Sequence, residues 1–130
     1  MMMLIVEDQD LMRQMLHEFL QSAYPDSLIL ETDSAERALE LCDSHRPRLV
    51  LIDVKLPDGN GIELTARVKA LLPETTVIVV SQYSAPVYIE RALAAGAFAY
   101  ITKDKMHREL LPAVADALGK APPQSLSEEQ

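Results

Sequence analysis

The stretch LVLIDVKLPDGNG, residues 49–61, decides the fold of this chain. Its first four residues are all apolar, a pattern typical of a strand that is buried on both faces of a parallel sheet. The apolar run stops at Asp53, and the turn-forming residues 57–61 follow. We therefore expect the Asp53 carboxylate to emerge at the carboxyl end of a central strand, the edge where ligands bind in open α/β sheets.

Apolar runs elsewhere in the chain predict four more strands, and segments of helical periodicity separate all five. We expect these strands at residues 3–6, 28–30, 76–80 and 98–101, and helices at about residues 11–24, 33–46, 62–72, 86–95 and 107–118. Asp33 is the expected N-cap of the second helix, with Glu36 in the capping-box position. Strands that alternate with helices predict a parallel α/β fold with right-handed crossovers.

Length and composition indicate one domain, because 130 residues with 48% hydrophobic and 25% charged side chains are ordinary for a globular protein. We expect residues 1–119 to form this domain and residues 120–130, which are polar and contain proline, to be a flexible tail or the start of a linker. A net charge of -8 argues against nucleic-acid contact by this domain. The lone cysteine, Cys42, fits a core position in a cytoplasmic protein, and the chain has no apolar run of about 18 residues that would enter a membrane.

Polar residues stand at the carboxyl ends of four of the five predicted strands. Glu7 and Asp8 follow the first strand, Asp53 the third, and Ser81 and Lys103 end the fourth and fifth. Because parallel strands deliver their carboxyl ends to one edge, these five residues are expected to converge. A hard divalent cation such as Mg²⁺ relieves the repulsion among the carboxylates, and the set as a whole has the groups that phosphoryl transfer requires.

Each of these residues also has an ordinary structural explanation. An aspartate such as Asp53 often forms turns, acids such as Glu7 and Asp8 favour helix N-termini, and Lys103 has the character of a surface cation. Five such coincidences at strand ends are improbable, so we favour a common site. The three histidines are spread over separate helices without metal-ligand spacing, and we interpret them as surface residues.

The chain contains, in this order, the acidic pair Glu7-Asp8, LIDVKLPDGNG around Asp53, VVS ending at Ser81, and GAFAYITK, which includes the aromatic Tyr100 and ends at Lys103. On these motifs it closely resembles the receiver domain of two-component response regulators. The resemblance covers residues 3 to about 119. It implies a flavodoxin-like (CheY-like) three-layer sandwich, with a five-stranded parallel sheet of order 2-1-3-4-5 and five helices. Asp104 stands where receivers often have proline, and this resembles regulators with a LuxR-type helix-turn-helix domain, which implies transcription regulation.

By this resemblance, Asp53 is the phosphoacceptor for a histidine kinase or a phosphotransfer protein. Asp8, Asp53 and the backbone carbonyl of Lys55 would bind Mg²⁺ directly, and Glu7 would reach the ion through water. The domain would promote its own phosphorylation and dephosphorylation, so we do not expect a conventional enzyme.

The resemblance also implies how the signal leaves the site. Lys103 and Ser81 would contact the phosphoryl oxygens, and Ser81 would move together with Tyr100 as a switch pair. The surface built from the fourth helix, fifth strand and fifth helix would then change its affinity for a partner, which includes a second copy of the chain as a homodimer.

Two alternative functions stay open at the level of sequence. One is an interaction module of the same fold that does not use phosphate. The other is an aspartate-dependent phosphohydrolase, which would also form an aspartyl-phosphate. Such enzymes usually have a second acid two residues after the nucleophile, whereas this chain has Lys55 there.

Overall fold

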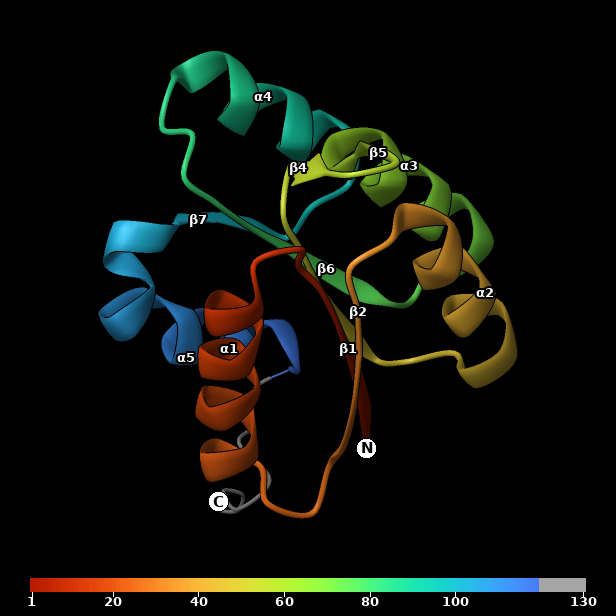
Figure 1. Ribbon diagram of the computed structural model, residues 1–130, viewed down its shortest axis with the longest axis vertical. Helices are drawn as coiled ribbons and strands as arrows, with labels where there is room; N and C mark the ends of the chain where they lie inside the picture. The colour runs from red at the N-terminus through yellow and green to blue at the C-terminus, as the bar shows by residue number, and fades with distance from the viewer. Residues whose placement is uncertain (120–130) are drawn as a thin grey trace.

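Five parallel strands form the central layer of the computed structural model, which describes residues 1–119 (Figure 1). In spatial order they are β2 (Leu28–Thr32), β1 (Met2–Val6), β3 (Leu49–Ile52), β6 (Thr76–Ser81) and β7 (Ala99–Thr102). A separate antiparallel pair, β4 (Lys55–Leu56) and β5 (Gly59–Asn60), lies between β3 and the next helix. When the five strands of this sheet are numbered along the chain, their spatial order is 2-1-3-4-5, which confirms the prediction. The predicted tail, residues 120–130, lies outside the described residues.

Helices cover both faces of the sheet. In Figure 1, α1 (Asp10–Ala23) and α5 (Met106–Ala117) lie on one side, and α2 (Ala35–His45), α3 (Gly61–Leu71) and α4 (Pro86–Ala94) on the other. Along β1, Leu4 and Val6 pack into the core under α2, α3 and α4, whereas Met3 and Ile5 pack into the core under α1 and α5. Both faces of the strand are buried, which explains why the apolar runs show no polar alternation. Within residues 1–119, no helix is long and apolar enough to span a membrane.

Several predicted element boundaries differ from the observed ones by one or two residues, and two of these differences concern Asp33 and Phe98. Ser34, not Asp33, is the N-cap of α2, because its backbone is extended and its hydroxyl accepts a hydrogen bond from the Arg37 N–H at 3.1 Å. The last strand begins at Ala99, and the preceding Phe98 is 51% exposed. Neither shift moves a residue that the sequence placed at the carboxyl edge of the sheet.

The N-terminus of α2 is also capped from a distant segment. The Asp58 carboxylate, in the turn between β4 and β5, accepts hydrogen bonds from the Ala35 N–H at 2.7 Å, the Glu36 N–H at 3.0 Å and the Ser34 hydroxyl at 2.9 Å. The two backbone bonds, followed by the Ser34 bond, lower the pKa of Asp58. The loop that follows Asp53 is thereby anchored to α2.

We predict that Asp58→Ala destabilises the fold at pH 7 and that the difference from wild type shrinks below about pH 4. The pKa of Asp58 is lowered in the folded state, so its contribution is present above the ordinary aspartate pKa and is lost as the pH falls through the folded value. Urea midpoints of both proteins at pH 7 and pH 3 measure this. Asp33→Ala, at the exposed neighbouring position, is the matched control and should leave the midpoint close to that of wild type. An equal loss at both pH values would contradict the capping role.

Candidate functional site

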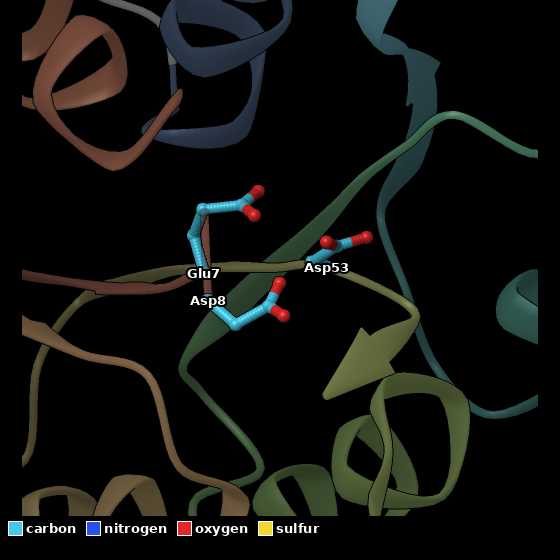
Figure 2. Close-up of side chains that lie close together, drawn as sticks. All are labelled: Glu7, Asp8 and Asp53. Atoms are coloured by element: carbon cyan, nitrogen blue, oxygen red, sulfur yellow. The ribbon is translucent and has the colours of Figure 1, made fainter. Parts of the chain in front are cut away.

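Three carboxylates gather at the point where the strand order reverses. Glu7 and Asp8 follow β1, Asp53 follows β3, and one oxygen of each lies within 4.8 Å of the others (Figure 2). The two strands are neighbours in the sheet, but the helices that follow them, α1 and α3, cover opposite faces. Open α/β sheets bind ligands at this place, outside the carboxyl ends of the strands where the strand order reverses.

The carboxylates differ in their exposure to solvent. The Glu7 residue is 1% exposed and Asp53 is 6% exposed, whereas Asp8 is exposed. The pKa of the Glu7 carboxyl is raised to about 7, mainly by burial and to a smaller extent by repulsion from Asp53, although a hydrogen bond from the Gln9 N–H and the charge of Lys103 oppose the rise. The environment of Glu7 therefore resists a full negative charge on its carboxyl group.

Lys103 brings one positive charge to these carboxylates. It follows β7 in the short 3-10 helix η1 (Lys103–Lys105), and its side chain is 11% exposed. Its Nζ lies 3.1 Å from Asp53 Oδ2, 3.3 Å from Glu7 Oε2 and 3.1 Å from Gln9 Oε1. The structure thus brings Glu7, Asp8, Asp53 and Lys103 together from three strand ends.

The donor set fits a hard divalent cation. Glu7 Oε1 is buried and accepts no hydrogen bond from the described residues, although Lys103 Nζ lies 3.1 Å from it. Among the described residues, the Lys103 ammonium pairs with Glu7 and Asp53, and no ion pair is formed by Asp8, the third carboxylate of the cluster. Carboxylate oxygens at this spacing are the ligands that Mg²⁺ prefers. Lys55, at the start of β4, follows Asp53 by two residues, and a role for its carbonyl stays a prediction.

Ser81 and Tyr100 are joined through the backbone of Tyr83. Ser81 ends β6 and is fully buried, and its Oγ accepts a hydrogen bond from the Tyr83 N–H at 3.1 Å. The Tyr100 hydroxyl, from β7, donates to the Tyr83 carbonyl at 2.6 Å. The Tyr83 ring stacks on Tyr88 of α4, with ring centroids 4.8 Å apart. Tyr83 thus contacts the Ser81 hydroxyl, the Tyr100 hydroxyl and helix α4.

Gly61 allows α3 to begin directly against the backbone of Asp53. A Cβ atom on Gly61 would lie 2.0 Å from the Asp53 carbonyl oxygen, far inside contact distance. Asn60 caps the helix at the same point, because its Oδ1 accepts a hydrogen bond from the Ile62 N–H at 2.7 Å. The glycine in the turn signal therefore has a packing role, which fixes the position of Asp53.

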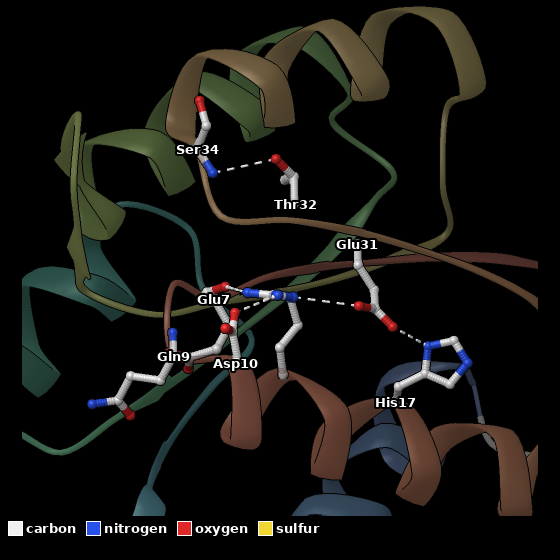
Figure 3. Close-up of polar contacts among 8 residues, drawn as sticks. Glu7, Gln9, Asp10, His17, Glu31, Thr32 and Ser34 are labelled. Atoms are coloured by element: carbon white, nitrogen blue, oxygen red, sulfur yellow. Dashed lines mark hydrogen bonds and ion pairs between the residues drawn. The ribbon is translucent and has the colours of Figure 1, made fainter.

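Sequence reasoning missed Arg13, which supports Glu7 from helix α1. Its Nη1 donates to the Glu7 carbonyl oxygen at 2.8 Å and its Nη2 to Asp10 at 2.7 Å, while its Nε lies 3.3 Å from Glu31 of β2 (Figure 3). The only signal in the sequence is a cation one helical turn after a group of acids, which is common on exposed helices. The side chain of Gln9 was missed as well.

The chain matches the family described as response regulator receiver domain over residues 3–115, and it belongs to this family. It is therefore a receiver domain of the two-component response regulators, whose general role is phosphorylation-dependent signalling. The family membership agrees with the acidic strand ends and the lysine described above.

Transcriptional regulators are among its relatives. The transcriptional regulatory protein PdtaR of Mycobacterium tuberculosis is 34% identical over 120 residues, which are 90% of this chain and 56% of PdtaR. The DNA-binding transcriptional activator DevR/DosR of the same species is 31% identical over 112 residues, 86% of this chain and 52% of the activator. The chain thus spans about half the length of these relatives. The crystal structure of a LuxR-family DNA-binding response regulator from Staphylococcus aureus is 26% identical, with a TM-score of 0.81, over 89% of this chain and 97% of that one.

We predict that Gly61→Ala destabilises the fold by about 3 kcal/mol, because the new methyl group forces α3 away from Asp53. Urea unfolding measures the loss. Gly59→Ala is the matched control, since a Cβ there would meet nothing closer than the Ala35 Cβ at 3.4 Å. Equal stability of the two variants would show that the close approach at Gly61 does not constrain the site.

Proposed function

We propose that this chain is a signalling receiver in which Asp53 accepts a phosphoryl group from a histidine kinase or a phosphotransfer protein. The observation that carries the proposal is the Asp53 carboxylate, 6% exposed, at a strand end beside two more carboxylates and 3.1 Å from the Lys103 ammonium. A carboxylate needs no general base to attack phosphorus. What it needs is positioning and compensation for the charge of the phosphoryl group.

Mg²⁺ would be held by Asp8, Asp53 and the Lys55 backbone carbonyl, with Glu7 reaching it through water. When bound, the ion would neutralise charge on the transferring group. The chain's own residues supply the rest. Asp53 provides the attacking oxygen, and Lys103 provides an ammonium group that lies 3.1 Å from Asp53 Oδ2. Because the Lys103 side chain is only 11% exposed, its charge is weakly screened.

The phosphorylated state would be read out through Ser81. A dianionic group on Asp53 attracts the Ser81 hydroxyl, which then weakens its bond to the Tyr83 N–H. Because the Tyr83 carbonyl also holds the Tyr100 hydroxyl, the loop before α4 and the Tyr100 ring would shift together. The affected surface is formed by α4, β7 and α5. We propose that it binds an effector domain that regulates transcription, or a second copy of the chain.

Signalling rather than turnover is supported by the residue two positions after Asp53. An aspartate-dependent phosphohydrolase usually has an acid there, and the chain has the exposed Lys55 instead. The domain would thus catalyse only its own phosphorylation and dephosphorylation. A histidine kinase as donor supports a cytoplasmic location, and the net charge of -8 argues against DNA contact by this domain.

Incubation with acetyl phosphate and Mg²⁺ tests the assignment of Asp53. We predict a phosphoryl adduct on the wild-type protein, detected by intact mass, that is absent without Mg²⁺ and absent in Asp53→Ala. Asp26→Ala, which removes an exposed aspartate in the turn after α1, should keep the adduct. Size-exclusion chromatography of the same samples reports whether dimerisation is the output. An adduct that persists in Asp53→Ala, or one that forms equally without Mg²⁺, would contradict the proposal.

Ser81→Ala separates phosphorylation from its readout. We predict that the variant still forms the adduct but that the phosphorylation-dependent change in partner or self-affinity falls about fivefold, because one coupling hydrogen bond is lost. Ser84→Ala, in the same loop and exposed, is the matched control. An unchanged affinity shift in Ser81→Ala would refute the switch role of Ser81.

A further inference from the structure

Gln9 occupies the N-cap position of α1 without capping the helix. Its backbone has the extended conformation of an N-cap residue, φ -84° and ψ 120°, and its carbonyl accepts the hydrogen bond from the Arg13 N–H at 2.9 Å. Its side chain makes no capping hydrogen bond. Glutamine is not among the residues that favour this position, which are serine, threonine, aspartate and asparagine. The helix therefore lacks the stabilisation that a shorter polar side chain would give.

The Gln9 residue instead contacts two members of the acidic site. Its N–H donates to Glu7 Oε2 at 3.0 Å, and its Oε1 accepts a hydrogen bond from Lys103 Nζ at 3.1 Å. In Figure 3 the Gln9 side chain extends away from the first turn of α1. One residue thus holds both the buried acid and the lysine.

The Lys103 ammonium has three N–H donors, and three residues, Glu7, Gln9 and Asp53, surround it with acceptor oxygens. Glu7 and Gln9 both come from the segment between β1 and α1, and with two donors directed at this segment, the third is directed at Asp53 Oδ2. Glutamine suits this place because its carbonyl oxygen accepts a hydrogen bond without adding a negative charge beside the incoming phosphoryl group.

We infer that Gln9 is a positioning residue that orients Lys103 and thereby sets the rate at which Asp53 is phosphorylated. The inference rests on the proposed phosphoacceptor role of Asp53. With acetyl phosphate as donor, an Asp53 oxygen forms a bond to phosphorus, the bond from phosphorus to the bridging oxygen breaks, and acetate leaves with that electron pair. No proton is transferred. Two N–H groups of Lys103 are directed at Gln9 and Glu7, and the third is directed at Asp53. This third N–H stabilises the negative charge on the phosphoryl oxygens.

Two substitutions separate positioning from structural support. Gln9→Ser places a capping hydroxyl on α1 and removes the contact to Lys103, so the Tm should rise by about 3 °C while the phosphorylation rate falls about tenfold. Gln9→Met keeps the length of the side chain without an acceptor, so the rate should fall similarly with little change in Tm. The Mg²⁺ concentration for half-maximal rate should stay unchanged in both, because Gln9 supplies no metal ligand.

The measurement is the rate of adduct formation from acetyl phosphate, followed by intact mass, together with Tm. Gln14→Met is the matched control, because Gln14 is exposed on the same helix and its side chain bonds to Glu18. Wild-type rates in both Gln9 variants would overturn the positioning role and leave the phosphoacceptor role intact. Absence of an adduct in the wild type would overturn the proposed function and this inference with it.

Discussion

Repulsion among Glu7, Asp8 and Asp53 is the constraint on which the rest of the site depends. The three carboxylates lie within 4.8 Å of one another, and two belong to residues that are almost fully buried, where their mutual repulsion is poorly screened. The compensating charge, Lys103, is 50 residues from Asp53 and 96 from Glu7 along the chain. Only the completed parallel sheet brings these groups together, so the site exists only in the folded domain.

The surroundings of Asp53 are rigid on one side and adjustable on the other. Toward α3, Gly61 leaves no space between the helix and the Asp53 carbonyl, and Asp58 ties the following turn to α2. Toward α4, hydrogen bonds through Tyr83 join Ser81 and Tyr100. Asp53 is therefore held in place, whereas the hydrogen bonds that involve Ser81 and Tyr100 can break and reform. Such an arrangement allows a change of charge at Asp53 to alter a distant surface.

The fold and the charged residues of the site were predictable from the sequence, because both follow from local patterns. Continuous apolar runs identified strands buried on both faces, and the polar residue that ended each run identified the edge where Glu7, Asp8, Asp53 and Lys103 meet. Sheet geometry, not residue spacing, then brings them into contact.

Contacts made by one side chain with a distant segment were not predictable in the same way. The sequence pattern placed the cap of α2 at Asp33, whereas Ser34 and the distant Asp58 cap the helix. The contact of Gln9 with Lys103 depends on a side-chain conformation that no periodicity encodes. The link through Tyr83 uses backbone groups, which every residue has, so the identity of the residue carries no signal for it.

A crystal structure of the protein with Mg²⁺ and beryllofluoride, a mimic of the phosphoryl group, tests the central claim most directly. The account predicts beryllium bonded to an Asp53 carboxylate oxygen, fluorides in contact with Lys103 Nζ and Ser81 Oγ, and the metal beside Asp8 and Asp53. Beryllofluoride bound elsewhere, or bound at Asp53 without contact to Lys103 and Ser81, would contradict the assignment of these residues to one phosphoryl-transfer site.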